Sequence, residues 1–322
     1  MEPSLSRAEF VSQQLGLPAS QVSVAAETDG SFSDRFEIRD IDGRRWFAKT
    51  LPSDVGSLEF CNDVGLFEKE RRFYVQVSRD TNPKSRTVLC FPEVKHSSDG
   101  LLVLAHLCDA GFEPCKPAKP ISNVEMQLLL SALAEFHIGF PADLEGFAPR
   151  HEWPGFGPCV APLVADGISK LRHEGWLEAE TIQALESCPI VETLTSAVEG
   201  PHVFCHGDCW LGNWFLKLDS QKAALIDFQF VGPSCAADDV IALMFTSMEG
   251  CVRRQHQAQL LEHYVSAYPD RGLVSERFKP SHWRHGAALA AVILLADLTL
   301  FPRELLRCAF EDIAELYRSS AS

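Results

Sequence analysis

One stretch of the sequence, residues 202–230, constrains the fold more than any other. It reads HVFCHGDCWLGNWFLKLDSQKAALIDFQF, an apolar run interrupted by Asp208, by Asn213 five positions later, and by Asp227 nineteen positions after Asp208. Three segments have the apolar content of short buried strands: 203–204, 213–218 and 223–226. A strand, a tight loop and a hairpin with these polar residues can hold a divalent cation through an amide oxygen and a carboxylate, while the other carboxylate faces a hydroxyl group.

The spacing of these residues is that of a kinase catalytic loop. His206, Asp208 and Asn213 match the pattern H-x-D-x-x-x-x-N, and IDFQ at 226–229 stands where protein kinases have D-F-G. With the later segment GPSCAADDVIALMFTS, these motifs resemble the aminoglycoside phosphotransferase and choline kinase superfamily of small-molecule kinases, and most of all its ecdysteroid-kinase-like branch. Gln229 in place of the D-F-G glycine suits this superfamily.

The resemblance implies an α+β, bilobal, protein-kinase-like fold. The expected N-lobe, residues 1–106, combines an antiparallel sheet with a helix, and the expected C-lobe, residues 107–322, is mainly helical. The chain of 322 residues with 46% hydrophobic residues is long enough for two such lobes.

Composition excludes several classes of protein. A net charge of −15 disfavours a nucleic-acid partner, because no basic surface would replace counterions. Eleven scattered cysteines without a CxxC pair, and an N-terminus without an apolar core, indicate a reduced, cytoplasmic setting. The longest apolar run, 286–301, contains Asp297 and is shorter than the roughly 20 residues that span a bilayer, so we expect a buried helix and no membrane partner.

The first part of the chain offers candidate nucleotide contacts. Asp42–Gly43 predicts a turn between two strands. A small polar bend precedes this hairpin, and its Gly30, Ser31 and Ser33 could offer amides and hydroxyls to phosphate oxygens. Because the bend lacks a G-x-G-x-x-G pattern, it would be interpreted as an ordinary loop without the motif at 206–229.

Lys49 and Glu70 are predicted to form a pair. Lys49 follows apolar residues on a strand and can contact phosphate as a point charge, although a surface lysine at a strand end is the alternative. The helical pattern over 58–77 places Glu70 on the apolar face, where a carboxylate needs a partner, whereas Glu68 should face solvent. The resemblance implies the same pair, and it implies that the backbone of Ala105 and Leu107 binds adenine.

In the kinase interpretation, Asp208 accepts the proton of a substrate hydroxyl as the γ-phosphoryl group of ATP moves. Asn213 and Asp227 hold Mg²⁺, which prefers oxygen ligands. His206 anchors the loop without transferring a proton, and the resemblance makes Asp239 a hydrogen-bonding brace of that loop, although a place near a helix N-terminus would also suit Asp239.

The remainder of the chain is expected to be mainly helical. A capping box, Ser122–Asn–Val–Glu125, predicts the start of a helix that ends near His137, which we interpret as a core histidine. The aromatic, Gly- and Pro-rich stretch 150–162 predicts a loop, and 168–185 predicts one helix. Three tryptophans are candidate walls of a pocket for an apolar or quaternary-ammonium acceptor: Trp153, Trp210 and Trp283.

Three alternatives remain open at this point. His206 and Asp208 could belong to a 2-His-1-carboxylate Fe(II) oxygenase, with His256 or His263 as the second histidine. A zinc site could use Cys205, His206 and Cys209, although the spacing fits no common zinc module. The chain could also be a pseudokinase that binds without catalysis. The sequence leaves the acceptor molecule unspecified.

Overall fold

A computed structural model describes residues 7–16, 18, 23–29, 33–39, 42–79, 87–268 and 278–319. The chain forms two compact units. The first comprises Met1–Pro83 and Phe91–Glu113, and the second comprises Lys84–Cys90 and Pro114–Ser322. The single boundary that the sequence predicts at residue 106 stays an expectation, and each unit is described below by itself.

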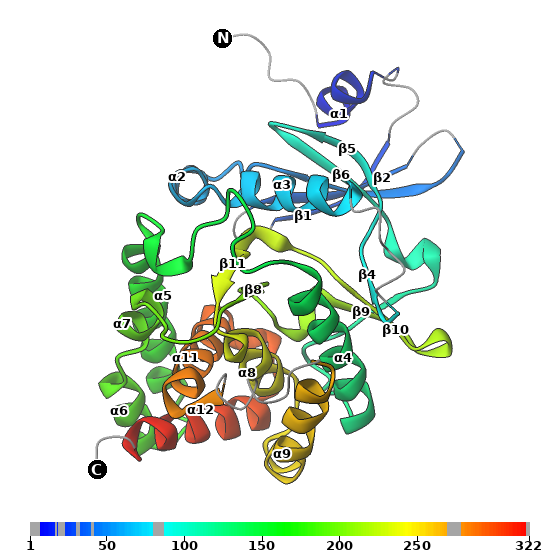
Figure 1. The fold of residues 1–322 in the computed structure, drawn as a ribbon. Coiled ribbons are helices and arrows are strands. Elements are labelled where there is room, and N and C mark those ends of the chain that lie inside the picture. The colour runs from blue at the N-terminus through cyan, green and yellow to red at the C-terminus, as the bar shows by residue number, and fades with distance from the viewer. Residues whose placement is uncertain are drawn as a thin grey trace. The chain divides into compact units, whose positions relative to one another are not determined.

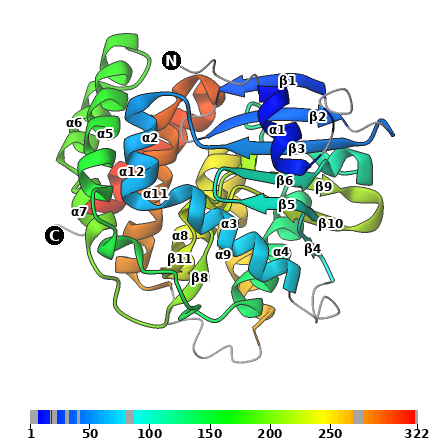
Figure 2. The same cartoon turned by 90° about the horizontal axis from the view of Figure 1, so that it is seen from above.

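The first unit is built on a five-stranded antiparallel sheet. Its strands are β1 (Ser23–Asp29), β2 (Asp34–Arg39), β3 (Arg45–Thr50), β5 (Val94–Ser98) and β6 (Leu101–Ala105). Figure 2 shows them side by side in the order β1-β2-β3-β6-β5. The predicted hairpin is confirmed, since β2 and β3 pair directly and Gly43 has the positive φ that the turn requires. Alternating side chains such as Phe36, Ile38 and Ala48 form its core.

Among the described residues of this unit there are three α-helices: α1 (Arg7–Leu15), α2 (Val55–Val64) and α3 (Leu66–Arg79). The sequence predicts one helix over 58–77, and this prediction is wrong, because two helices cover these residues. Gly65, with φ 70° and ψ 34°, ends α2 in the left-handed conformation, and α3 starts at the next residue. Helix α3 contacts strand β5 of the sheet (Figure 1). A short 3₁₀ helix, η3 (Leu107–Ala110), follows β6.

The second unit contains two small sheets that carry the 202–230 stretch. One has the order β4-β10-β9-β7, and the other pairs β11 with β8. The strands are β4 (Leu89–Cys90), β7 (Glu113–Pro114), β8 (Val203–Cys205), β9 (Trp214–Lys217), β10 (Lys222–Leu225) and β11 (Gly232–Ser234). The three strands predicted in this stretch are therefore confirmed as β8, β9 and β10, with β9 and β10 forming an antiparallel pair.

Helices make up most of the second unit. Those in the described residues are α4 (Asn123–Gly139), α5 (Phe156–Glu174), α6 (Ala179–Ser187), α7 (Ile190–Thr195), α8 (Ala236–Ser247), α9 (Gly250–Ser266), α11 (Pro280–Ala296) and α12 (Arg303–Arg318). Every residue of α8 is buried. Helix α11 packs against it (Figure 1), and Gly286 permits the approach, because a Cβ there would lie 2.3 Å from the carbonyl oxygen of Ala237. The predicted mixture of an antiparallel sheet and a mainly helical part is confirmed as an α+β fold.

For the helices of the second unit, local signals were correct at one helix start and misleading in two stretches. The predicted capping box at α4 is present, with reciprocal bonds between Ser122 and Glu125. The loop expected over 150–162 is wrong: α5 begins at Phe156 and continues through Pro162, after a 3₁₀ helix, η4 (Arg150–Glu152). One helix over 168–185 is also wrong, because Gly175 at φ 67° ends α5 and α6 begins four residues later.

The apolar run at 286–301 is only partly the buried helix that the sequence predicts. Its first part, through Ala296, lies in α11, whereas Asp297 ends that helix and Leu298–Leu300 form a 3₁₀ helix, η9. Among the residues described, no helix is long and apolar enough to cross a membrane.

Candidate active site

The loop between β8 and β9 holds the carboxylate of Asp208 by one oxygen. Asn213 Nδ2 donates to Asp208 Oδ2 at 2.9 Å and to the Asp208 backbone carbonyl at 2.8 Å. Trp210 Nε1 donates to the same Oδ2 at 3.2 Å. Within the described part of the chain, Oδ1 of this half-buried side chain accepts no hydrogen bond. The carboxylate therefore has one oriented oxygen and one that is available to an incoming hydroxyl.

The electrostatic surroundings of Asp208 favour a proton acceptor. Burial raises the pKa of Asp208 above its ordinary value, and the negative charge of Asp227 raises this pKa further. His206 and the hydrogen bonds from Asn213 and Trp210 act in the opposite direction, because they stabilise the ionised carboxylate. A carboxylate with a raised pKa is a stronger base than one exposed to water.

Asn213 and Asp227 are brought together by the β9–β10 hairpin. The backbone carbonyl of Asn213 accepts a hydrogen bond from Ile226 N at 3.0 Å, which places Asn213 beside the residue that precedes Asp227. Asp227 is buried and has φ 67° and ψ 65°, a left-handed conformation that costs energy outside glycine. Since Asn213 uses Nδ2 to bind Asp208, its amide oxygen is left as an acceptor. An amide oxygen and a carboxylate fit the hard oxygen ligands that Mg²⁺ prefers.

His206 and Asp239 hold the loop that carries Asp208 through hydrogen bonds to its backbone. Asp239 Oδ2 accepts from His206 N at 2.6 Å, and Oδ1 accepts from Gly207 N at 2.9 Å. The His206 ring lies between two backbone groups: Nε2 bonds to the carbonyl of Ile226 at 2.9 Å, and Nδ1 accepts from Asp208 N at 3.3 Å. A carbonyl only accepts, so Nε2 carries the hydrogen and Nδ1 is the bare nitrogen. Their contribution to catalysis stays a prediction.

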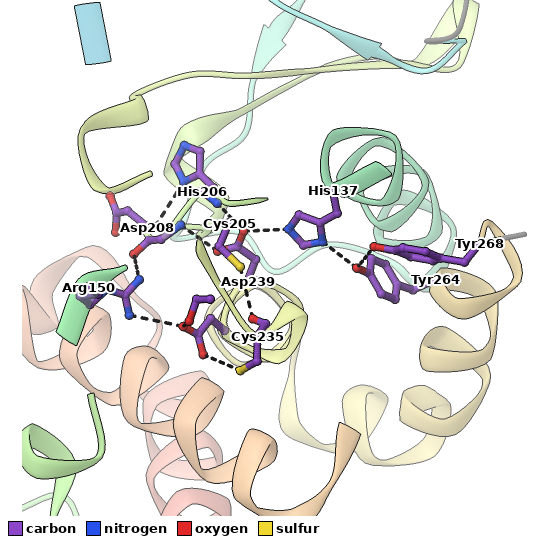
Figure 3. Close-up of polar contacts among 12 residues, drawn as sticks. His137, Arg150, Cys205, His206, Asp208, Cys235, Asp239, Tyr264 and Tyr268 are labelled. Atoms are coloured by element: carbon purple, nitrogen blue, oxygen red, sulfur yellow. Dashed lines mark hydrogen bonds and ion pairs between the residues drawn. The ribbon is translucent and has the colours of Figure 1, made fainter. Parts of the chain in front are cut away.

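A chain of buried side chains extends from Asp239 towards α9 (Figure 3). His137 Nε2 lies 3.0 Å from Asp239 Oδ2, and His137 Nδ1 lies 2.6 Å from the hydroxyl of Tyr264. That hydroxyl is 2.6 Å from the hydroxyl of Tyr268. His137 is buried, as the sequence indicates, but it also connects the loop brace to α9, a role for which position on an apolar face gives no signal.

Two more buried residues that sequence reasoning missed contact Asp238, the neighbour of Asp239. His285 Nδ1 lies 2.6 Å from Asp238 Oδ1, and Arg150 Nη1 lies 3.5 Å from Asp238 Oδ2. Arg150 also reaches the loop itself, where Nη2 donates to the carbonyl of Gly207 at 3.2 Å (Figure 3). The sequence indicated these contacts only weakly. Arg150 lies in an aromatic stretch, and Asp238 precedes the predicted brace Asp239.

The first unit contains the buried ion pair that the sequence predicts between Lys49 and Glu70. Lys49 Nζ lies 2.6 Å from Glu70 Oε2, and the two side chains are 2% and 1% exposed. Glu68 is the more exposed carboxylate, and it binds Arg71 and Arg72 on the outer face of α3.

The other candidate nucleotide contacts are less defined. Ser33 is buried and its hydroxyl accepts from Arg35 Nε at 3.3 Å, whereas Gly30 and Ser31 lie outside the described residues. The backbone N–H of Ala105 already donates to Glu93 O at 2.8 Å, so Ala105 could offer a ligand only its carbonyl. Leu107 starts η3 and is buried.

The three tryptophans have different environments. Trp210 is half-buried, bonds to Asp208 and packs against Phe301, with ring centroids 5.7 Å apart. Trp153 is only 6% exposed and donates to the carbonyl of Ala148, so it is mainly a core residue. Trp283 is half-buried on α11. Of the three, Trp210 is the one with a direct contact to Asp208.

The metal-site alternatives conflict with this geometry. Both ring nitrogens of His206 are occupied by backbone groups, so this residue has no free nitrogen for iron or zinc. Cys205 Sγ donates to the carbonyl of Cys235, and burial raises the pKa of both Cys205 and Cys209, which disfavours the thiolate that zinc requires. The oxygenase and zinc interpretations therefore lose the histidine on which each depends.

Together, the sheet-bearing unit, the helical unit and the loop of Asp208 define a protein-kinase-like fold of the small-molecule kinase type. The chain belongs to the ecdysteroid kinase-like family, whose family model matches residues 31–139 and 167–270. The resemblance drawn from HGDCWLGN and IDFQ is thereby confirmed. Comparison with curated protein sequences found no significant match.

Solved structures support the same fold. A type I macrolide 2'-phosphotransferase has 16% identity and a TM-score of 0.52, with 96% of this chain and 98% of that chain covered. An aminoglycoside phosphotransferase from Streptomyces rimosus has 18% identity and a TM-score of 0.51, covering 83% and 92%. A choline kinase from Cryptosporidium parvum has 12% identity and a TM-score of 0.53, covering 94% and 90%. The expectation of a small-molecule kinase is confirmed at the level of family and fold.

Proposed function

We propose that the protein transfers the γ-phosphoryl group of ATP to a hydroxyl group of a small molecule, with Asp208 as the catalytic base. The observation that carries this proposal is the asymmetric carboxylate of Asp208. Two donors, Asn213 Nδ2 and Trp210 Nε1, hold Oδ2, and Oδ1 accepts no hydrogen bond from the described residues. A base of this kind is oriented before the acceptor arrives, which lowers the entropy cost of reaction.

The reaction we propose has one bond formed and one broken. The acceptor hydroxyl donates a hydrogen bond to Oδ1 of Asp208, and its oxygen attacks the γ-phosphorus. The bond from the γ-phosphorus to the bridging oxygen breaks, and ADP leaves with that electron pair. Asp208 takes the hydroxyl proton, and the raised pKa of Asp208 favours this step.

Charge neutralisation is assigned to residues of both units. In the second unit, Asn213 and Asp227 would hold Mg²⁺, which would neutralise the negative charge that develops on the phosphate oxygens. In the first unit, the ammonium group of Lys49 would contact phosphate oxygens, with Glu70 holding its side chain at 2.6 Å. Ser33, Gly30 and Ser31 as phosphate contacts, and the backbone of Ala105 and Leu107 as adenine contacts, stay part of the proposal.

The acceptor is proposed to carry an apolar or quaternary-ammonium group beside its hydroxyl. Trp210 supports this, because its ring is half-buried next to Asp208 and is backed by Phe301. Macrolides, aminoglycosides and choline are the compounds that give similar structures their names. A reduced, cytoplasmic setting belongs to the same proposal, supported by eleven cysteines that are all free thiols.

The proposal is tested by a screen of hydroxylated small molecules with ATP and Mg²⁺, with ADP release as the first readout and a phosphorylated product as the second. We expect Asp208→Asn to lower turnover by at least about a thousandfold, because the isosteric amide cannot accept the proton. Asp219→Asn is the matched control, since Asp219 is exposed in the turn between β9 and β10.

Each outcome distinguishes a different interpretation. Loss of turnover in Asp208→Asn but not in Asp219→Asn supports the proposal. Turnover of Asp208→Asn within about tenfold of the wild type would overturn the role of Asp208, since a missing base costs more than that. ATP binding without any product, across a broad set of alcohols, would instead favour the pseudokinase alternative.

A further inference from the structure

Arg150 is a buried arginine that the proposed chemistry does not use. It is 5% exposed, begins the 3₁₀ helix η4, and lies with its guanidinium 5.6 Å from the ring centre of Phe156. Removing an arginine from water is costly, so a buried one is retained where its donors serve a purpose. Here one donor nitrogen, Nη2, binds the carbonyl of Gly207, the residue that precedes Asp208.

We propose that Arg150 is a positioning residue, which together with Asp238 sets the orientation of the peptide group that carries Asp208. This inference rests on the proposed function, because it assigns Arg150 a part in the same reaction. It differs from the brace by Asp239, which acts on N–H groups, since Arg150 acts on a carbonyl.

The peptide groups around Gly207 are fixed from both sides. The N–H of Gly207 donates to Asp239 Oδ1 at 2.9 Å, and the carbonyl of Gly207 accepts from Arg150 Nη2 at 3.2 Å. The N–H of Asp208 belongs to the same peptide group as that carbonyl, and it donates to His206 Nδ1 at 3.3 Å. Arg150 and His206 therefore hold the two ends of one peptide plane, and that plane determines where the Asp208 side chain starts.

The backbone at Gly207 needs this support. Its φ of +79° is a conformation that other residues rarely adopt. A Cβ at this position would lie 2.1 Å from the carbonyl oxygen of Phe230 and 2.9 Å from Arg150 Nη2. The arginine thus fills the space that a side chain would need, and glycine is required for the loop and the guanidinium to approach each other.

Asp238 gives the guanidinium a fixed anchor. Its carboxylate accepts from Ser234 Oγ at 2.6 Å and Cys235 Sγ at 3.2 Å, and lies 2.6 Å from His285 Nδ1 and 3.5 Å from Arg150 Nη1. Burial works against ionisation, yet His285, Arg150 and Ser234 hold the pKa of Asp238 well below its usual range. The anchor is therefore an anion, and two consecutive residues of α8 support the loop by separate routes.

The chemistry of the site explains why an arginine is needed. Nη1 and Nη2 are the two ends of a rigid planar fork. Nη1 forms an ion pair with Asp238 at 3.5 Å without a hydrogen bond, so the carboxylate attracts one end of the fork while Nη2 binds the Gly207 carbonyl. A lysine has a single donor centre and cannot contact Asp238 and the Gly207 carbonyl with the same geometry. Arg150→Lys keeps the charge and removes the fork, which isolates the positioning effect.

The test compares Arg150→Lys with Arg253→Lys in the full-length protein. Arg253 is the matched control: it is 1% exposed, pairs with Asp312 at 2.5 Å and lies 3.7 Å over the ring of Phe245, with no contact to the loop. We expect Arg150→Lys to lower kcat by about a hundredfold with the KM for ATP unchanged, since a small misplacement of a reacting group has that effect. Arg253→Lys should change kcat by less than about threefold, because it does not touch the loop.

A second readout, amide hydrogen exchange followed by mass spectrometry, does not depend on activity. Arg150→Lys should speed exchange in the peptide that contains residues 203–210 by at least about tenfold, and Arg253→Lys should not. If Arg150→Lys does not fold, Asp238→Asn provides the same comparison, because it removes the anchor of the fork.

The possible results separate the two proposals. Unchanged exchange at 203–210 together with unchanged kcat in Arg150→Lys would overturn the role of Arg150 and leave the phosphotransferase proposal intact. If the wild type transfers no phosphate, the proposed function fails, and the exchange data alone decide whether Arg150 holds the loop. Equal kcat losses in Arg150→Lys and Arg253→Lys would indicate general destabilisation and would also refute the inference.

Discussion

Substitutions in the ion pair between Lys49 and Glu70 should change the stability of the fold and the rate of phosphotransfer differently. Both side chains are almost fully buried, at 2% and 1% exposed, and their charged atoms are 2.6 Å apart. Lys49→Met and Glu70→Leu each remove one member of this buried ion pair and leave the other charge buried. The double substitution replaces both charges with apolar groups of similar volume.

The expected free energies follow from this burial. Breaking a buried ion pair by removing one partner costs about 3–5 kcal/mol of unfolding free energy, whereas replacing both partners by apolar residues is often neutral or stabilising. We therefore expect each single variant to lose about 3–5 kcal/mol, and the double variant to return to within about 1 kcal/mol of the wild type. An exposed pair on α12, Arg318 with Glu315 at 3.0 Å, should show a coupling of only about 0.2–1 kcal/mol.

The rate of phosphotransfer should not recover in the double variant as its unfolding free energy does. The double variant lacks the Lys49 ammonium group that we assign to phosphate, so we expect its kcat/KM to stay at least about a hundredfold below the wild type even though its fold is restored. Urea denaturation followed by circular dichroism gives the free energies, and ADP release gives kcat/KM. A double variant that is as active as the wild type would refute the assignment of Lys49 to ATP and make the pair purely structural.

Two further predictions concern the loop. Burial raises the pKa of Asp208, and Asp208 must be ionised to act as a base, so kcat/KM should fall on the acid side with an apparent pKa above the ordinary aspartate value of about 3.9. Trp210→Phe removes a hydrogen bond that lowers this pKa, so the acid limb should move to higher pH; a shift to lower pH would contradict the geometry. Gly207→Ala should reduce kcat by at least about a hundredfold and destabilise the fold, because its Cβ would meet Phe230 O. Gly43 also has a positive φ, but it has open space where a Cβ would lie. In Gly43→Ala, urea denaturation followed by circular dichroism should therefore show an unfolding free energy lower by only the cost of backbone strain, about 1–2 kcal/mol, and kcat should not change.

Part of the fold follows from local chemistry that the sequence displays. The turn at Asp42–Gly43 and the capping box at Ser122–Glu125 have the conformations that their residue types favour, and both were predictable. The helix ends at Gly65 and Gly175 were not predictable, because a glycine inside an amphipathic pattern is compatible either with a continuous helix or with a left-handed end.

At the start of helix α5 the sequence predicted a loop where the structure has a helix. The stretch from Arg150 to Pro162 is rich in glycine and proline, which favour turns, and its period is not helical. Pro158 is nevertheless the third residue of the helix, where no intrahelical partner is lost. Pro162 lies inside the helix, whose buried face includes Phe156 and Val160.

The arrangement of the candidate site was predictable where its residues are close in sequence. Asp208, Asn213 and Asp227 fall in one stretch, and their spacing predicts the loop and hairpin that bring them together. Arg150 precedes Gly207 by 57 positions, and no pattern in the sequence links the two. Side chains that hold a loop through tertiary contacts become visible only when the helices that carry them are placed.

We propose that a phosphoryl group moves from ATP to a hydroxyl group near Asp208. The most direct test incubates the protein with Mg²⁺, acceptor alcohols and ATP whose γ-phosphoryl oxygens carry ¹⁸O, and follows the label by mass spectrometry. We expect a labelled phosphate ester with the wild type and with Asp219→Asn, and none above background with Asp208→Asn. Label that appears only in inorganic phosphate would contradict transfer to an alcohol, and an ester that forms equally well with Asp208→Asn would contradict Asp208 as the base.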